Sequence, residues 1–273
     1  MRFAAYAPTF GDYDVPTLSA LAREAEAAGW DGFFIWDHLV WAPDGAPLAD
    51  TTVALTAIAL ATERIRLGAL VTPLARRRPW KFAKETATLD RLSGGRLVTG
   101  VGLGIESDFF PVGERFAATE RAHRLDESLE IVSSLWSGEP VTHHGKHFQL
   151  ERVALHPTPV QQPSIPIWVA GFWPNRPPFR RAARWNGAIP QRRGNPFEPL
   201  APDELRECAT YLSAHRTSDS PFDLVASWFG PHRDHLSLSA YQQAGATWWL
   251  DGVNPWTESL HEYAARISHG PPS

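Results

Sequence analysis

The sequence has little cysteine, little methionine and no long block of like charge. Its 273 residues include one cysteine and one methionine. A single cysteine excludes an internal disulfide framework and suits a reducing compartment. Because Cys208 falls in a predicted helix with no base beside it in the sequence, we interpret it as a buried structural residue and not as a nucleophile.

Charge runs and long apolar runs are scarce as well. The longest block of like charge is the three arginines at 76–78, the formal net charge is -4 and the pI is about 6.3. These values argue against a nucleic-acid or polyanion binder and leave room for a small anionic ligand. No stretch approaches the ~18 apolar residues of a membrane span, and the N-terminus lacks the apolar run of a signal peptide. We therefore expect a soluble, cytoplasmic protein with no membrane partner.

The sequence does contain a repeated strand–helix unit, seen most clearly at residues 65–104. The apolar runs typical of strands are residues 2–8, 32–36, 65–73, 96–104, 166–172, 186–190, 222–230 and 245–253. Amphipathic helical patterns follow them at residues 15–28, 51–62, 80–92, 120–135, 176–184, 202–215, 236–244 and 258–267. Buried strands that alternate with helices predict parallel pairing with right-handed crossovers.

Eight such units predict an α/β fold, a single (β/α)8 TIM barrel over residues 1–273, and the length is close to the roughly 250 residues typical of one. A six-stranded open sheet is the alternative, but it leaves two units without a place. Residues 137–165 break the period. We expect a short hairpin with a proline-bounded linker there, inserted after the fourth helix.

The chemistry of such a barrel lies at the carboxyl ends of its strands. The residues there are mostly aromatic and cationic, which favours a flat conjugated ligand with an anionic group. Asp37–His38 is an acid–imidazole pair at a strand end, where His38 can exchange a proton and Asp37 can orient it. The alternative is that Asp37 caps a turn while His38 packs beside Trp36. The substrate pocket is predicted to include Phe10, Trp41, Glu106 and Trp228.

Three further motifs are open to two interpretations each. The turn after the fifth strand, with Gly171, Phe172, Trp173, Asn175 and Arg176, suits a phosphate or is an ordinary helix start. The glycines around Gly102 and Gly104 leave room for a ring or permit tight strand packing. The arginines at 76–78 receive an anionic tail or form a solvated loop. No metal site is predicted, because the histidines at 143, 144 and 147 lack partners at metal spacing.

Four segments, residues 22–39, 61–104, 125–150 and 157–171, resemble the bacterial luciferase-like flavin-dependent oxidoreductases. The similarity runs in order over about residues 1–190 and is most specific at residues 65–104. It implies a (β/α)8 barrel that binds reduced FMN or coenzyme F-420 (8-hydroxy-5-deazaflavin) at the strand carboxyl ends. It also implies a homodimer, as in many members.

The resemblance assigns roles to individual residues. In deazaflavin users an Asp–His pair ends the second strand near the reactive ring, which matches Asp37 and His38. A non-prolyl cis peptide in the third strand would fall at Ala69–Leu70, beneath the ring and close to Thr72, and the phosphate would lie at residues 171–176. Sugar-phosphate dehydrogenases of the group carry a glutamate directly after the glycines of strand four. Here that place is Ile105, which argues against such a substrate.

We therefore expect a luciferase-like oxidoreductase in which His38, backed by Asp37, handles a proton near the cofactor. F-420 would give hydride transfer, whereas reduced FMN would give monooxygenation with a flavin reductase as partner. Tryptophans at the rim favour a small apolar or aromatic organic substrate. The alternative is a non-catalytic flavin-binding barrel that acts as a carrier or sensor.

Overall fold

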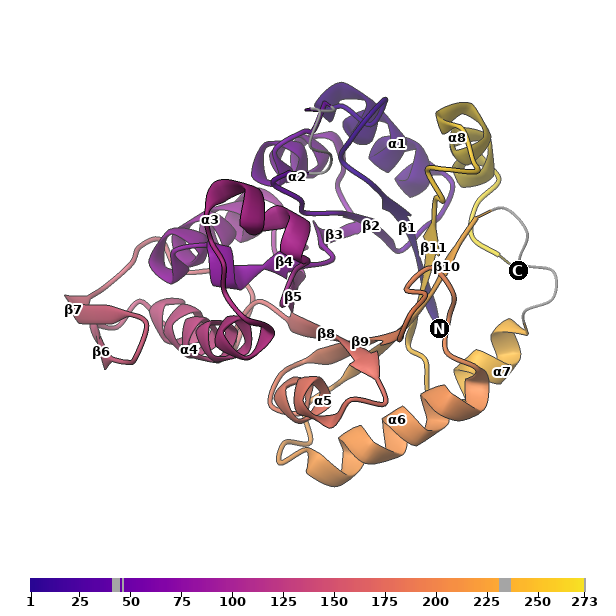
Figure 1. The fold of residues 1–273 in the computed structure, drawn as a ribbon. Helices are drawn as coiled ribbons and strands as arrows, with labels where there is room; N and C mark the ends of the chain where they lie inside the picture. The colour runs from indigo at the N-terminus through magenta and orange to yellow at the C-terminus, as the bar shows by residue number, and fades with distance from the viewer. Residues whose placement is uncertain (41–44, 46, 231–236, 273) are drawn as a thin grey trace.

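The computed structural model describes residues 1–40, 45, 47–230 and 237–272. A curled parallel sheet surrounds a central axis, with the helices outside it (Figure 1). Its strand order is β3-β2-β1-β11-β10-β9-β8-β5-β4. The strands are β1 (Arg2–Ala7), β2 (Gly32–Ile35), β3 (Arg66–Ala69), β4 (Thr72–Pro73), β5 (Thr99–Gly102), β8 (Ile167–Trp173), β9 (Gly187–Arg192), β10 (Asp223–Phe229) and β11 (Trp248–Gly252).

The sheet closes on itself next to β3. A parallel bridge joins Leu67 to Leu97, and the Val98 N–H donates to the Leu67 carbonyl at 2.8 Å. Since β3 and β4 are two parts of one strand position, the barrel has eight positions. The predicted (β/α)8 barrel is therefore confirmed.

The helices begin where the sequence predicts caps. Asp14 and Asp50 each accept a backbone N–H three residues on, at 2.9 Å, and so cap α1 and α2. The helices are α1 (Val15–Ala27), α2 (Thr51–Ala61), α3 (Pro79–Leu92), α4 (Ala118–Leu135), α5 (Arg176–Ala182), α6 (Pro202–His215), α7 (Leu238–Gln243) and α8 (Leu260–Ser268), with short 3-10 turns η1 (Leu74–Arg76), η2 (Glu106–Asp108) and η3 (Phe110–Val112). In the described part of the chain, no helix has the length and apolar character needed to cross a membrane.

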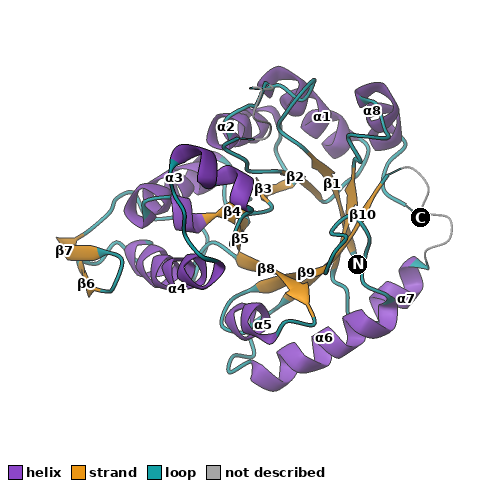
Figure 2. Cartoon of the chain, in the orientation of Figure 1, coloured by secondary structure: helices purple, strands orange, loops and turns teal. Residues whose placement is uncertain are grey.

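An antiparallel hairpin lies outside the barrel, beside α4 (Figure 2). Its strands are β6 (Val141–His144) and β7 (Gln149–Val153), which fall within the predicted insertion. His143 and the backbone of Phe148 both bond to Glu127 of α4, at 3.0 and 2.7 Å. The hairpin is thus tied to the fourth helix.

The inside of the barrel is filled by its own apolar cluster. This cluster consists of Ala4, Phe34, Leu70, Val98, Trp168, Ile189, Val225, Trp248 and Leu250. Tyr6, Val71 and Ala170 pack on it and are only partly buried. Because inward-facing residues alternate along a strand, Tyr6 lies one layer beyond Ala4 towards the carboxyl ends. These three residues form the floor of the barrel mouth.

The predicted third strand is interrupted, and the predicted position of its cis peptide is wrong by one residue. The cis bond joins Leu70 to Val71, not Ala69 to Leu70. The Leu70 N–H still donates to the Ile35 carbonyl at 2.9 Å, so the Ala69–Leu70 peptide belongs to the regular ladder with β2. The irregular backbone begins only after that ladder ends.

Candidate functional site

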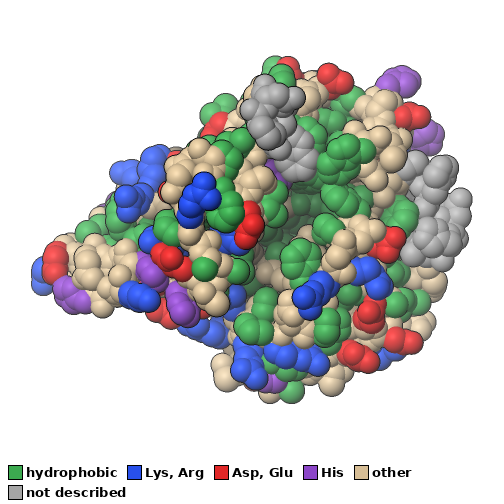
Figure 3. All heavy atoms as spheres, in the orientation of Figure 1, with side chains coloured by type: hydrophobic (Ala, Val, Ile, Leu, Met, Phe, Trp, Pro, Cys, Tyr) green, Lys and Arg blue, Asp and Glu red, His purple; other side chains and the backbone are tan. Residues whose placement is uncertain are grey.

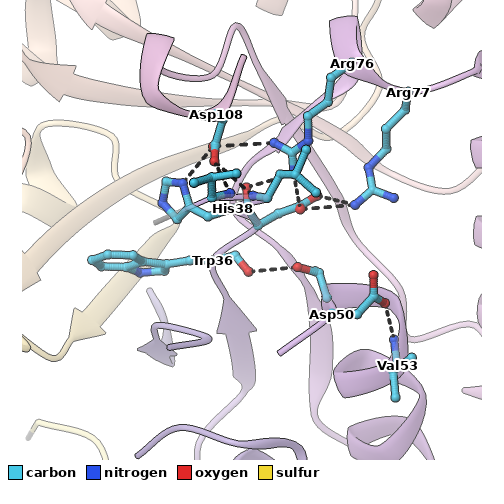
Figure 4. Close-up of polar contacts among 11 residues, drawn as sticks. Trp36, His38, Asp50, Val53, Arg76, Arg77 and Asp108 are labelled. Atoms are coloured by element: carbon cyan, nitrogen blue, oxygen red, sulfur yellow. Dashed lines mark hydrogen bonds and ion pairs between the residues drawn. The ribbon is translucent and has the colours of Figure 1, made fainter. Parts of the chain in front are cut away.

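His38 lies at the mouth of the barrel, three residues after β2. Its side chain is 17% exposed, and its Nδ1 lies 2.8 Å from Oδ2 of Asp108, whose side chain is fully buried. The other Asp108 oxygen accepts the N–H groups of Leu39 and Val40, at 2.9 and 3.0 Å (Figure 4). Asp108 therefore fixes both the imidazole ring and the backbone that follows it.

The ionisation of Asp108 decides what His38 can do. Burial alone would raise the pKa of Asp108, but the hydrogen bond and charge of His38 and the two backbone N–H groups outweigh it and lower that pKa. Because the carboxylate is ionised and only accepts, Nδ1 of His38 carries the proton of this hydrogen bond. Proton exchange with a ligand then falls to Nε2.

Asp37 does not contact His38 as predicted. Its Oδ1 lies 2.6 Å from Nη2 of Arg76 and its Oδ2 lies 2.8 Å from Nη2 of Arg77. Consecutive side chains of an extended segment point to opposite sides, so Asp37 faces the arginine loop while His38 faces Asp108. Arg76 also approaches Asp108, at 3.5 Å. The prediction that Asp37 orients His38 is wrong, because Asp108 takes that part.

Aromatic rings surround His38 on the opposite side. The centroid of the Trp36 ring lies 5.9 Å from that of His38 and 5.6 Å from that of Phe10. The ring centroids of Phe197 and Phe229 lie 5.0 Å apart. They lie 6.2 and 6.3 Å, respectively, from the centroid of Trp36. Figure 3 shows a hollow over the centre of the barrel with hydrophobic side chains around it. We call these four aromatic residues the aromatic wall.

The predicted substrate residues divide into several groups. Phe10 is part of the aromatic wall, whereas Trp41 lies outside the described residues. Trp228 is partly buried and donates from Nε1 to the Gly230 carbonyl at 2.9 Å. Glu106 is exposed at the start of η2.

Sequence reasoning missed two residues of this site. Asp108 lies in an acidic loop, but no spacing rule connects it to His38, which is distant in sequence. Phe197 lies in an irregular segment between β9 and α6. The acidic loop directly after a strand end was the only signal for Asp108, and Phe197 had none.

Strand packing requires glycine at positions in β5 and just after it. A Cβ on Gly100 would lie 2.5 Å from the Ala69 carbonyl oxygen, and one on Gly104, which has a φ of +69°, would lie 2.6 Å from Pro73 Cβ. A Cβ on Gly102 would meet the side chain of Val71 at 2.7 Å, at the floor of the mouth. Of the two interpretations, close packing accounts for Gly100 and Gly104, while Gly102 borders the mouth.

The turn predicted to bind phosphate has an aromatic environment. Arg176 stacks on the rings of Trp173 and Tyr211, at 4.3 and 4.5 Å from their centroids. Asn175 precedes α5 but its side chain does not cap it. Gly171 packs on the side chain of Pro178, whereas Phe172 is exposed. A phosphate site at this turn stays a prediction.

Ala69, Leu70 and Thr72 are all buried beneath the mouth. The Tyr6 hydroxyl donates to the Leu70 carbonyl, and burial raises the pKa of Tyr6 above its ordinary range. Tyr6 therefore stays neutral and supports the floor. These buried residues are placed to shape the floor from below, and a direct contact with a cofactor stays a prediction.

Cys208 is fully buried, and burial raises the pKa of its thiol to about 12. This agrees with the interpretation as a structural residue. Within residues 1–40, 45, 47–230 and 237–272, no three His, Cys, Asp or Glu side chains come together in a way that could hold a metal ion.

Comparison with known proteins places this site in a family context. Residues 1–176 match the model of the luciferase-like monooxygenase family. An F420-dependent glucose-6-phosphate dehydrogenase of Nakamurella multipartita is 34% identical over 175 residues, which are 63% of this chain and 50% of that protein. A protein with the same description from Microbacterium testaceum is 30% identical over 239 residues, 85% of this chain and 68% of that protein. The chain thus spans half the length of the first relative.

A solved structure extends the similarity over the whole chain. An F420-dependent secondary alcohol dehydrogenase in complex with an F420-acetone adduct superposes with a TM-score of 0.81, covering 99% of this chain and 98% of its own. The two sequences are 17% identical, so this likeness shows the fold.

Proposed function

We propose that the chain, which belongs to the luciferase-like monooxygenase family, is an oxidoreductase that uses coenzyme F-420 to transfer hydride to or from a small apolar or aromatic substrate. The observation that supports this most is the His38–Asp108 pair at an apolar barrel mouth. Relatives described as F420-dependent support the choice of F-420 over FMN.

The residues of the mouth fit a flat conjugated ring. Its floor is formed by Tyr6, Val71 and Ala170, and Gly102 adds no side chain to it. Val71 and Ala170 contribute apolar side chains to this floor, as the face of a ring requires. When bound, F-420 would supply two-electron hydride chemistry.

His38 would hold or move the proton that accompanies hydride transfer. Nδ1 is engaged by Asp108, so Nε2 is the atom that accepts a proton from a substrate hydroxyl or donates one to a carbonyl. The buried carboxylate fixes the tautomer and the ring orientation. In this role His38 is the catalytic residue and Asp108 is the positioning residue.

The surroundings of His38 favour an apolar or aromatic substrate over a sugar phosphate. Trp36, Phe197 and Phe229 present apolar faces next to the imidazole. Arg76 and Arg77, which lie near the site, are both engaged by Asp37. Among the described residues, a substrate phosphate at His38 would therefore meet aromatic rings rather than unpaired guanidinium groups.

Titration of the protein with F-420 and with FMN, followed by fluorescence, tests the cofactor. We expect saturable binding of F-420 that is at least about tenfold tighter than that of FMN, a difference of about 1.4 kcal/mol. Preferential binding of FMN would overturn the deazaflavin assignment and favour a monooxygenase. Binding of neither would refute the proposed function.

Variants of the pair test the catalytic role. We expect His38→Ala to lower kcat by about 10²- to 10⁴-fold, as for loss of a general acid or base, while F-420 still binds. Asp108→Asn should lower kcat by roughly 10- to 100-fold with little change in F-420 affinity, because a neutral amide no longer fixes the tautomer and orientation of the imidazole. Glu139→Gln, at an exposed acid between α4 and the hairpin, is the control. Unchanged turnover in His38→Ala would leave a non-catalytic flavin carrier as the better description.

A further inference from the structure

A second cavity lies beside the arginines at 76–78. It has a volume of about 270 Å³. Its lining residues are Ala75, Arg76, Arg77, Arg78, Glu114, Phe116, Arg124 and Phe148. They come from η1, the two residues before α3, the segment before α4, α4 itself and the hairpin. None of them belongs to the aromatic wall or the floor of the barrel mouth.

The lining carries an excess of positive charge. Four guanidinium groups face one carboxylate, that of Glu114, around this cavity. Asp37 pairs with both Arg76 and Arg77, Asp108 approaches Arg76 at 3.5 Å, and Glu120 pairs with Arg124 at 3.1 Å. Arg78 is exposed and takes part in no ion pair with any residue of the described ranges. An anion is the ligand that such a field attracts.

Contacts with neighbouring side chains restrict the orientation of two of these guanidinium groups. Arg124 stacks on Phe116 at 4.1 Å from the ring centroid, which restricts its plane. The Nη2 of Arg77 is fixed by Asp37, while its Nε is buried and has no hydrogen-bond partner among the described residues. A buried donor without an acceptor is unfavourable, so a ligand oxygen that reached it would be stabilised.

The α3 helix adds to the same field. Arg78 is its N-cap residue, and no side chain caps its first turn. The free N–H groups and the positive end of the helix dipole favour an anion at this point. Phe116 and Phe148 supply apolar surface beside the guanidinium groups, and the cavity is larger than a single phosphate ion requires.

From these observations we propose that the cavity is a binding site for a phosphate monoester, and that its occupancy is coupled to His38. The route of coupling is short. Arg76 lines the cavity, and its Nη1 lies 3.5 Å from Oδ2 of Asp108. The same oxygen of Asp108 lies 2.8 Å from Nδ1 of His38. A phosphate that draws Arg76 towards the cavity weakens its contacts with Asp37 and Asp108 and so alters the setting of the imidazole.

Isothermal titration of the cofactor-free protein with phenyl phosphate and with inorganic phosphate tests the site. We expect both to bind, phenyl phosphate more tightly because of the two phenylalanines, and affinity to fall with added NaCl. The double variant Arg78→Gln/Arg124→Gln should bind at least about tenfold more weakly. Arg91→Gln removes an exposed arginine from the other end of α3. Its affinity for phenyl phosphate should stay within about twofold of the wild-type value.

The imidazole resonances of His38, assigned with His38→Gln, report the coupling. Phenyl phosphate should shift them in the wild-type protein and not in the double variant. A titration with FMN in the presence of phenyl phosphate separates two sources of the phosphate: competition identifies the phosphate of a flavin cofactor, and independent binding identifies a separate phosphorylated ligand.

Two results would overturn the proposal. Absence of binding at millimolar phenyl phosphate, or equal affinity in wild type and a double variant that melts like wild type, would exclude the site. Binding that leaves the His38 resonances unchanged would exclude the coupling. Neither readout depends on turnover, so failure of the proposed oxidoreductase function leaves both measurements interpretable.

Discussion

At the scale of single residues, Asp108 joins several parts of the candidate site. It bonds to the ring of His38, to two backbone N–H groups and to Arg76. The sequence indicated His38 through its place at a strand end. It did not indicate Asp108, because the contact depends on how two loops fold over the barrel and not on any local spacing.

The pKa of Asp108 makes the stability of this loop depend on pH. Its folded pKa lies below the ordinary value of 3.8. The ionised form is thus favoured by folding, and the stabilisation is fully present above pH 3.8 and is lost as the pH falls through the lower folded pKa. We expect Asp108→Asn to lower the free energy of unfolding at pH 7 by about 1–3 kcal/mol.

Urea unfolding at pH 7, 5 and 3 measures this effect. The difference in the free energy of unfolding between wild type and Asp108→Asn should be constant from pH 7 to 5 and smaller at pH 3. The free energy of unfolding of Glu106→Gln should match that of the wild type at all three pH values. A difference that stays constant down to pH 3 would show that the Asp108 carboxylate does not contribute through its charge.

At the scale of elements, β5 illustrates how closely the strands approach. Gly100 and Gly102 both belong to this strand, and their neighbours differ in kind. A Cβ on Gly100 would meet the carbonyl oxygen of Ala69, which cannot move without the strand, whereas a Cβ on Gly102 would meet the side chain of Val71, which is partly exposed and can rotate.

We therefore expect Gly100→Ala to lower the free energy of unfolding by about 1–3 kcal/mol, the range for overpacking a well-packed core. Gly102→Ala should cost less stability and instead weaken cofactor binding, because its methyl group enters the floor of the mouth. Thermal unfolding together with the F-420 titration distinguishes the two. Equal loss of stability in both variants would mean that the floor is as rigid as the strands.

At the scale of the whole molecule, α2 presents apolar side chains to solvent. Val53 and Leu60 are 57% and 69% exposed. They lie seven residues apart and so share one face of the helix, and the helix is apolar along most of its length. An exposed apolar helix face of this kind is typical of a subunit interface.

We expect the chain to form a homodimer through this face and Leu60→Asp to make it monomeric. Light scattering after size-exclusion chromatography gives the mass of each. Val160→Asp, at another exposed apolar residue on the linker after the hairpin, should leave the dimer intact. A monomeric wild-type protein at micromolar concentration would contradict this prediction.

The arrangement of elements and the place of the site follow from the sequence itself. Apolar runs of strand length, caps such as Asp14 and Asp50, and the glycines that stop helices are local signals, and eight repeats of them close into only one common barrel. Once the barrel is known, His38 must lie at its mouth, because it comes shortly after the carboxyl end of a strand.

Only the tertiary structure decided which side chains meet there. Asp37 faces Arg76 and Arg77, while Asp108 takes the imidazole of His38. Phe197 joins the aromatic wall from an irregular segment. Loop side chains have no fixed period, so their directions depend on long-range packing and on where buried charges find partners. Local patterns therefore determine the barrel, and contacts between distant segments determine the chemistry at its mouth.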